Sequence, residues 1–528
     1  MTATDRGNLG GLLADLARRR GDTMAIGSPE GVVTYRELYA QARRVCGALR
    51  TAGVLPGDRV ALLGPNSPRY IAAIFGTFLA GAVSVGVSTW YTPEQIGYVL
   101  GHAEPKALFT VPDFLGRDYI AEVKELPVTP VVYDLDDWAA IDTAAEVDAT
   151  LAPPDSAAYL LYTSGSTGPP KGVLLRHDGL IRNSTEAAAK LGIGPDDVAY
   201  VGVPLCFAYG CVQGLLTSFV HGAGVVIQRR FEPAEGLALV ERFGCTTWFG
   251  VPSMVRRTVA VPGFRTDRLA TVTKGRVGHA PDDIRFARER FGMANVCVGY
   301  GMTELYGPCA LSDREDDLDS RIEGWCDVLP STDIRIVDPD TEQEVPPGEP
   351  GEIRAKSVFG YLAYYRDPER NAAQFDAHGY FRTGDQGVRR ADGRLRFTGR
   401  YKNLIKTNGL NIAAEDIERG MVAHPAVTEA CAFGIPHRTK EEAPVVVVVT
   451  DGTADAESLL AWRESAFLSF EAPAVVVAAG VLPKMSEQKI DRLRVAADCR
   501  AWLDQQDDLT AFLDGTRILA WDGVRDDD

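Results

Sequence analysis

Short apolar runs rich in β-branched residues alternate along the chain with longer stretches in which apolar residues recur at helical spacing. Runs of this kind are typical of buried strands, and the stretches between them are long enough for covering helices. The alternation predicts βαβ units and an α/β fold of mostly parallel sheets covered by helices. The strands are predicted at 59–63, 83–87, 107–110, 131–133, 157–162 and 199–203.

The uncharged segment 71–93 approaches the length of a membrane span. Gly76, Gly81 and Gly86 interrupt it, and serine and threonine are frequent in it. We therefore interpret it as a small-residue helix at 70–79 followed by the strand at 83–87, and we expect no membrane span.

The pattern changes at 400–403, where a charged segment separates a strand-like run from a new apolar series. We predict a large N-terminal domain over 1–399, a hinge at 400–403 and a small α+β domain over 404–528. The tail at 493–528 has a helix-like amphipathic pattern, which favours packing on its own domain, with a partner contact as the alternative.

Charge narrows the range of partners. The 528 residues include 55 lysines and arginines against 72 aspartates and glutamates, a net charge of −17. Such a surface repels nucleic acid and anionic membranes, so an anionic ligand needs a local cation or a glycine-rich loop. The acidic run 313–319 lacks the glycine and the spacing of a calcium loop, and we expect a solvated loop there.

Nine cysteines lie scattered along the chain without a CxxC pair. This usage predicts reduced thiols and a cytoplasmic enzyme. The N-terminal segment shows no basic region followed by an apolar stretch, so no secretory signal is expected.

The segment 159–172 reads YLLYTSGSTGPPKG, an apolar strand that enters a loop of hydroxyls and glycines ending at Lys171. Open backbone N–H groups, hydroxyl donors and one ammonium suit a polyphosphate. It is not a Walker loop, because Gly172 stands where that motif requires serine or threonine. The segment predicts a phosphate grip.

This segment resembles the signature of the adenylate-forming superfamily, which includes acyl- and aryl-CoA synthetases, luciferases and peptide-synthetase adenylation domains. Further blocks follow in the family's order: YGMTE at 300–304, YFRTGD at 380–385, GRYK at 399–402 and PKMSEQKI at 483–490. The resemblance is nearest to aryl- and acyl-CoA ligases, in which a mobile small domain rotates between two half-reactions.

The resemblance implies ATP, Mg²⁺ and the co-substrate CoA. Thr303 would contact the α-phosphate, Glu304 would hold Mg²⁺, and Asp385 would accept the ribose hydroxyls. The nucleotide-binding residues implied in this way are Thr163, Ser164, Gly165, Ser166, Thr167, Gly168, Gly278, His279, Ala280, Tyr300, Gly301, Met302, Thr303, Asp385 and Arg400.

Lys489 resembles the small-domain lysine that reaches the carboxylate and the α-phosphate during adenylation, and Lys484 is the competing lysine. Lys402 matches the hinge position, and Asn408 and Gly409 match the loop that admits the thiol. Asn408 stands where the family commonly has glycine. The catalytic residues implied are Lys489, Thr303, Glu304 and Lys171.

The acid pocket is predicted from the block after the phosphate loop. Phe207 stands where many acyl-CoA synthetases have histidine, and the phrase FAYG resembles benzoate-type ligases, which favours an aromatic or bulky apolar acid. Residues 207–213 hold no aspartate, which disfavours an α-amino acid. The predicted pocket residues are Phe207, Ala208, Tyr209, Gly210, Trp248, Phe249 and Gly250.

Together these features predict an ATP-dependent acid–thiol ligase that adenylates a small-molecule carboxylic acid and transfers the acyl group to CoA. The alternatives are adenylation for a carrier protein or of another oxyanion such as nitrite, an enzyme of one half-reaction, and a luciferase-like oxygenase. A non-catalytic binder would not need the intact set of blocks. The oligomeric state stays open, with a homodimer among the options.

Overall fold

Two units make up the chain. The computed structural model describes residues 7–163, 170–278, 281–359, 363–407, 410–437, 441–467, 472–478, 480–486, 489–505 and 519–521. Unit 1 comprises Met1–Ile334, Arg354–Arg382 and Arg390–Arg396, and unit 2 comprises Arg335–Ile353, Thr383–Arg389 and Phe397–Asp528. The predicted hinge at 400–403 falls inside unit 2, because the last segment of that unit begins at Phe397. Two segments of the predicted N-terminal domain, Arg335–Ile353 and Thr383–Arg389, also belong to unit 2.

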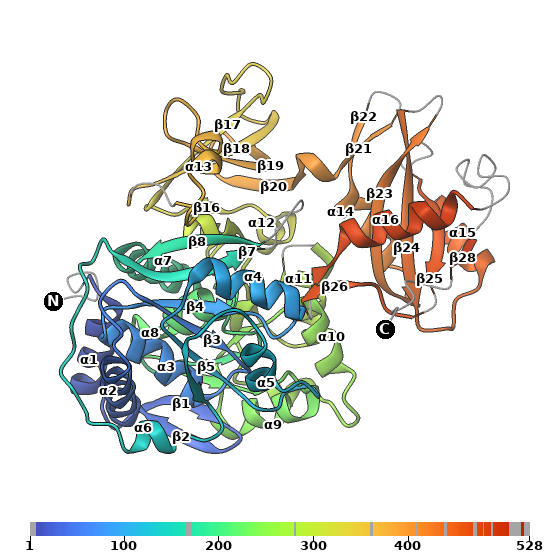
Figure 1. The fold of residues 1–528 in the computed structure, drawn as a ribbon. Coiled ribbons are helices and arrows are strands. Elements are labelled where there is room, and N and C mark those ends of the chain that lie inside the picture. The colour runs from blue at the N-terminus through green and yellow to red at the C-terminus, as the bar shows by residue number, and fades with distance from the viewer. Residues whose placement is uncertain are drawn as a thin grey trace. The chain divides into compact units, whose positions relative to one another are not determined.

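The first sheet of unit 1 has the order β6-β5-β3-β4-β7-β8 and is parallel except for the last pair. The predicted strands at 59–63, 83–87 and 107–110 are confirmed. Strand bounds are β3 Arg59–Leu63, β4 Val83–Val87, β5 Ala107–Thr110, β6 Val131–Asp134, β7 Ala157–Thr163 and β8 Lys171–Arg176. The helices between them and after β8 are α3 Pro68–Leu79, α4 Pro93–Ala103, α5 Tyr119–Lys124, α6 Ala139–Asp142 and α7 His177–Leu191 (Figure 1).

Helix α3 and strand β4 account for the uncharged segment. Ser67 caps the helix by accepting from Tyr70 N, and Pro68 occupies its first turn, where a missing N–H costs nothing. Gly81 has a φ of 74°, which turns the chain between the helix and β4. Among the described residues no helix is long and apolar enough to cross a membrane.

The second sheet of unit 1 has the order β13-β12-β11-β9-β10-β1-β2, parallel except for β1 and β2. Its strands are β1 Met24–Ser28, β2 Gly31–Thr34, β9 Val198–Val201, β10 Gly224–Ile227, β11 Thr247–Phe249, β12 Lys274–Arg276 and β13 Asn295–Val296. The associated helices are α1 Leu9–Arg19, α2 Tyr35–Thr51, the π-helix η2 Tyr209–Leu216, α8 Thr217–Phe219, α9 Pro233–Phe243, α10 Pro252–Val259, η3 Thr266–Leu269 and α11 Pro281–Glu289.

Two smaller sheets follow along the chain. The first joins β14 Gly299–Met302, β15 Gly307–Leu311 and β16 Asp327–Val328, with η4 Thr303–Leu305 and α12 Leu318–Glu323 in its connections. The second has the order β17-β18-β19-β20, formed by Thr332–Val337, Pro350–Ser357, Phe381–Arg389 and Leu395–Arg400, with α13 Pro368–Gln374 between β18 and β19.

The C-terminal part of unit 2 is built on a six-stranded sheet of order β22-β21-β24-β25-β28, with β23 paired to β24. Consecutive valines at 445–449 are buried on both faces of β24: α16 packs on one face, and α14 and α15 on the other. The bounds are η5 Tyr401–Asn403, β21 Leu404–Thr407, β22 Leu410–Ala413, α14 Ala414–Val422, β23 Val427–His437, β24 Glu441–Thr450, α15 Ala456–Ala466, β25 Ala474–Ala478, β26 Lys484–Ser486, β27 Lys489–Ile490, α16 Arg492–Leu503 and β28 Leu519–Trp521.

The described parts of the tail, residues 493–505 and 519–521, pack on the sheet of their own unit, and the second of them is a strand where the pattern is helix-like. Strand β28 adds to β25 in parallel, and Trp521 is 4% exposed in the core that α16 covers. All nine cysteines lie in the described residues, and they are buried and form no disulfide, which agrees with the expectation of reduced thiols.

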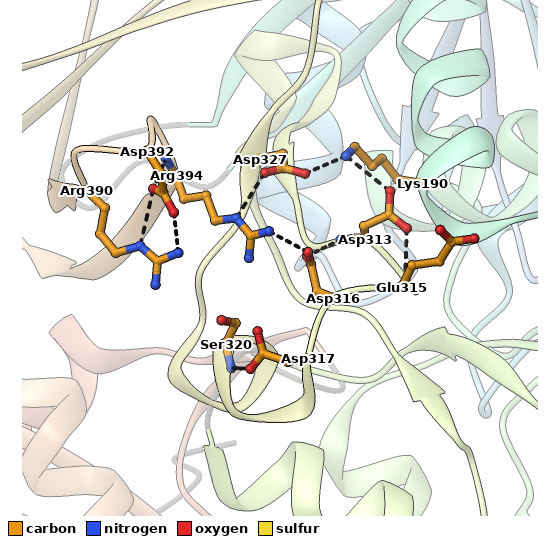
Figure 2. A network of polar contacts seen from close by, with 10 residues as sticks. All are labelled: Lys190, Asp313, Glu315, Asp316, Asp317, Ser320, Asp327, Arg390, Asp392 and Arg394. Carbon is orange, nitrogen blue, oxygen red and sulfur yellow. Dashed lines mark hydrogen bonds and ion pairs between the residues drawn. The ribbon is translucent and has the colours of Figure 1, made fainter.

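The prediction of a solvated loop at 313–319 is wrong for two of its acids. Figure 2 shows Lys190 bound to Asp327 at 2.6 Å and to Asp313 at 3.2 Å, and Arg394 bound to Asp316 at 2.7 Å. The negative charges of these two acids are compensated by two cations from distant parts of unit 1, Lys190 on α7 and Arg394 after β19. The local sequence pattern could not predict these ion pairs, because their cations are distant in the chain.

Candidate functional site: a phosphate grip and its cation

The two ends of the predicted phosphate loop are held together by strand pairing. β7 and β8 are antiparallel, and Thr163 is the register partner of Lys171. The loop residues Ser164, Gly165, Ser166, Thr167 and Gly168 lie outside the described residues. The sheet therefore fixes where the loop leaves and returns, and it places Lys171 at the base of the loop.

Lys171 is partly buried, and it makes no hydrogen bond or ion pair with any residue that the structure describes. Its ammonium lies 5.5 Å from the centroid of the Tyr364 ring, a cation–π distance. Burial lowers the pKa of Lys171 below its ordinary value, and Arg370 lowers it further, against the opposing charges of Glu304 and Asp367. The three N–H donors of this cation are thus available to a ligand.

Glu304, in η4, contacts Tyr364, the same tyrosine whose ring lies near Lys171. The Tyr364 hydroxyl donates to Glu304 Oε1 at 2.9 Å. Tyr364 is 6% exposed, its backbone is bound on both sides by Asn371, and burial raises the pKa of its hydroxyl, which keeps it protonated as a donor. Lys171, Tyr364 and Glu304, which we call the grip cluster, come from three separate segments of unit 1. The sequence analysis missed Tyr364, since no motif marks it and only its tertiary contacts reveal it.

Strand β14 carries the predicted nucleotide-binding residues Tyr300, Gly301 and Met302, and the predicted α-phosphate residue Thr303 begins η4. Tyr300 is 7% exposed, and its carbonyl accepts a hydrogen bond from Cys309 Sγ at 3.5 Å. Gly301 is exposed, but a Cβ there would overlap the backbone of Gly307, so the bend into Met302 and Thr303 requires glycine. Gly278 follows β12, while His279 and Ala280 lie outside the described residues.

The predicted ribose residues meet in unit 2. Asp385 is 2% exposed, and Arg400 Nε lies 3.1 Å from its Oδ1. The preceding Gly384 has a φ of 68°, and its N–H is bound by Glu352 at 3.0 Å, which fixes the turn. The pair unites residues from β19 and β20, so the structure brings these two predicted residues together.

The small-domain predictions are less visible in the structure. Lys402 is exposed in η5, Asn408 and Gly409 lie outside the described residues, and Lys489 begins β27 without a described side chain. The competing lysine is different: Lys484 forms an ion pair with Glu429. Its charge is already neutralised within unit 2.

The predicted acid-pocket residues lie at the carboxyl ends of the parallel strands, where α/β sheets bind ligands. Phe207 is partly exposed and Ala208 and Gly210 are buried at the start of η2, and the Tyr209 hydroxyl lies 2.8 Å from the Gly250 carbonyl. Phe249 is fully buried. Trp248 is also fully buried, with its ring against Tyr200 and Phe291, so it packs the core; its part in a pocket stays a prediction.

The donor set fits Mg²⁺ held with a nucleotide. The described residues contain no group of three or more histidine, cysteine or acidic side chains that would cage a metal by themselves. One carboxylate oxygen of Glu304 accepts a hydrogen bond from Tyr364, and the other oxygen has no partner among the described residues. Mg²⁺ is commonly held by one or two carboxylates together with substrate phosphates, which matches this arrangement.

Comparison with protein families decides the identity. The model of the AMP-binding enzyme family matches residues 13–365, and that of the AMP-binding enzyme C-terminal domain matches residues 416–489. The chain belongs to the AMP-binding enzyme family. It is an AMP-forming acid–thiol ligase. ATP and CoA as substrates and Mg²⁺ as cofactor fit this class of enzyme.

Relatives of this AMP-binding enzyme match nearly its whole length. A feruloyl-CoA synthase of Amycolatopsis is 33% identical, over 87% of this chain and 92% of the relative. A sulfoacetate–CoA ligase of Cupriavidus necator is 30% identical, over 92% and 97%. The crystal structure of ATP-bound MatB from Rhodopseudomonas palustris is similar with a TM-score of 0.82 and 29% identity, over 94% and 99%. The two-part α/β fold predicted from the sequence is confirmed.

Proposed function

We propose that this enzyme adenylates a carboxylic acid with ATP, releases pyrophosphate, and then transfers the acyl group to CoA with release of AMP. The observation that carries the proposal is the grip cluster: an unpaired, partly buried ammonium and a carboxylate held on one tyrosine at the base of the phosphate loop. A cation and a metal-binding carboxylate side by side suit the triphosphate of ATP and its Mg²⁺.

The first step joins two anions. A carboxylate oxygen attacks the α-phosphorus, the bond from that phosphorus to the pyrophosphate oxygen breaks, and an acyl adenylate forms. Lys171 binds the departing phosphates, and Lys489 neutralises the carboxylate and the α-phosphate as they approach. Bound Mg²⁺, held through Glu304, adds charge neutralisation on the phosphates.

In the second step a thiol attacks the carbonyl carbon of the mixed anhydride, the bond to AMP breaks, and the thiol proton leaves to solvent. We propose that the small domain turns about Lys402 between the steps, which brings Asn408 and Gly409 to the site in place of Lys489. Lys402 is exposed in a one-turn helix between β20 and β21, a short connection that suits a hinge.

The proposed acid is aromatic or bulky and apolar around its reacting carboxylate. Phe207 is partly exposed at the carboxyl edge of the second sheet. One relative supports this proposal by its name: the feruloyl-CoA synthase of Amycolatopsis acts on an aromatic acid.

The test is pyrophosphate release with ATP and Mg²⁺ over a panel of aromatic, aliphatic and amino acids, with and without CoA. We expect acid-dependent release, and a thioester when CoA is present. Lys489→Ala should lower the rate by about 10²- to 10³-fold, while Lys484→Ala, which loses only its ion pair with Glu429, should change it less than about threefold. No release with any acid, or undiminished release in Lys489→Ala, would contradict the proposal or that role.

A further inference from the structure

Arg276 occupies a position that the nucleotide site does not explain. It is the last residue of β12 and the register partner of Phe249 at the end of β11. It therefore stands at the carboxyl edge of the parallel sheet, where ligands of α/β proteins bind. The chain continues from β12 to Gly278, so Arg276 lies in the chain order between the predicted acid-pocket residues and the predicted nucleotide-binding residue Gly278.

Neutral oxygens hold the guanidinium in place. Nη1 donates to Gln213 Oε1, on the π-helix η2, and Nη2 donates to the Gly299 carbonyl at 3.3 Å, at the start of β14. The guanidinium carbon lies 6.0 Å from the centroid of the Tyr209 ring. Arg276 thus touches both the strand that carries Tyr300 and the helix that carries the predicted acid-pocket block.

Hydrogen bonds fix the backbone around Arg276. The Tyr209 hydroxyl lies 2.8 Å from the Gly250 carbonyl and 3.0 Å from the Arg276 carbonyl, and Gly250 N donates to Arg276 O at 3.2 Å. Burial raises the pKa of Tyr209 to about 12, so the hydroxyl stays protonated as a donor. A fixed backbone and a π-helix, a rare element that is frequent at functional sites, position the guanidinium before any ligand binds.

Within the described residues no carboxylate lies within ion-pair distance of Arg276, and its Nε is buried without a hydrogen-bond partner. Lys274, two residues earlier on the same face of β12, shows the usual arrangement: its ammonium lies 2.8 Å from Asp197. Arg354, also in unit 1, faces Asp376 at 3.5 Å. A partly buried cation without a counter-charge is costly unless an anion joins it.

A second uncompensated guanidinium adds to the local positive charge. Arg321 is 5% exposed, and its Nε and Nη1 have no hydrogen-bond partner in the described part of the chain. Burial raises the pKa of the Cys297 thiol to about 11, and the charges of Arg321 and Arg276 both oppose this shift. The charge of Asp313 also raises the pKa of Cys297, but Lys190 forms an ion pair with that carboxylate.

We propose that Arg276 binds a second anionic group, a carboxylate or sulfonate, on the acid substrate, away from the carboxylate that is adenylated. This inference rests on the proposed function and narrows its substrate class to acids that carry two anions. The planar guanidinium suits either group, because both present paired oxygens to its forked N–H donors. The net charge of −17 makes such a local cation necessary for a dianion to enter.

The experiment compares acids that differ only in the second group: terephthalate and 4-sulfobenzoate against 4-methylbenzoate, isophthalate against 3-methylbenzoate, and succinate against butyrate. Pyrophosphate release gives kcat/KM for each acid in the wild type, Arg276→Gln and Arg276→Lys. Arg265→Gln is the matched control, since that side chain is 71% exposed and forms its one ion pair among the described residues with Asp267 at the surface. Thermal unfolding of each variant reports whether the fold is retained.

We expect the wild type to prefer at least one dianionic acid over its methyl analogue. Arg276→Gln should lower kcat/KM for that acid by roughly 10- to 100-fold and change the methyl analogue less than about threefold, with Arg276→Lys between the two. Equal losses for both members of a pair, or a wild type that prefers every methyl analogue, would overturn the inference while the ligase function stands. Release with none of the acids would overturn both.

Discussion

Two partly buried lysines of unit 1 have opposite electrostatic surroundings. Lys190 lies between Asp327 and Asp313, and although burial alone lowers its pKa, these carboxylates raise it above the ordinary value (Figure 2). Lys171 forms no ion pair with any carboxylate that the structure describes, and burial together with Arg370 lowers its pKa. Carboxylates of the protein itself bind Lys190, whereas the described residues leave the Lys171 ammonium without such a partner, as the proposed role in binding phosphate requires.

The largest expected effect is on activity at Lys171. Lys171→Met keeps the approximate length of the side chain and removes the one positive charge of the grip cluster. We expect kcat/KM for ATP to fall by about 10²- to 10³-fold, with the midpoint of urea unfolding unchanged, as measured by pyrophosphate release and circular dichroism. A variant that loses stability and activity together would show that Lys171 supports the fold instead.

The same substitution at Lys190 should have the reverse result. Lys190→Met leaves Asp313 and Asp327 without their shared cation, and we expect the free energy of unfolding to fall by about 1–3 kcal/mol, with pyrophosphate release per folded enzyme within about twofold of the wild type. Urea unfolding measures the first quantity. Unchanged stability with impaired catalysis would break the comparison.

Tyr364 is expected to act through Glu304. Tyr364→Phe keeps the ring beside Lys171 but removes the hydroxyl that donates to Glu304, so the carboxylate loses its orientation. We expect the Mg²⁺ concentration for half-maximal activity to rise by roughly three- to tenfold with a smaller change in kcat. Tyr133→Phe, which removes a hydroxyl bound to the Ala48 carbonyl, is the control. An equal effect of both variants would exclude the positioning role.

The smallest effect is a shift in pH dependence. Lys171 must be protonated to bind phosphate, so activity should decline on the alkaline side, and its lowered pKa moves that decline below the pH typical of a free lysine. Arg370→Gln removes one cause of the lowering and should move the alkaline limb to higher pH, while Arg370→Lys should leave it in place. A limb that stays unmoved in Arg370→Gln would assign it to another group.

Much of the fold was predictable because it is written in local patterns. Strands such as 59–63 and 83–87 are short apolar runs between helical stretches, and Ser67 and Pro68 mark the start of α3. The phosphate loop was found because glycines and hydroxyls cluster within a few residues, and the other nucleotide blocks were found by their resemblance to the adenylate-forming superfamily. The acidic run 313–319 was misinterpreted because its cations, Lys190 and Arg394, are distant in the chain.

The sequence by itself determined the α/β class, the order of the family blocks and the identity of Lys171, Glu304 and Asp385 as candidates. Only the tertiary structure decided which charges are already paired. Tyr364 joins Lys171 and Glu304, Asp197 neutralises Lys274, and no carboxylate in the described part of the chain pairs with Arg276. The reason is physical: local patterns fix backbone conformation over a few residues, whereas charge compensation acts through space between segments that only folding brings together.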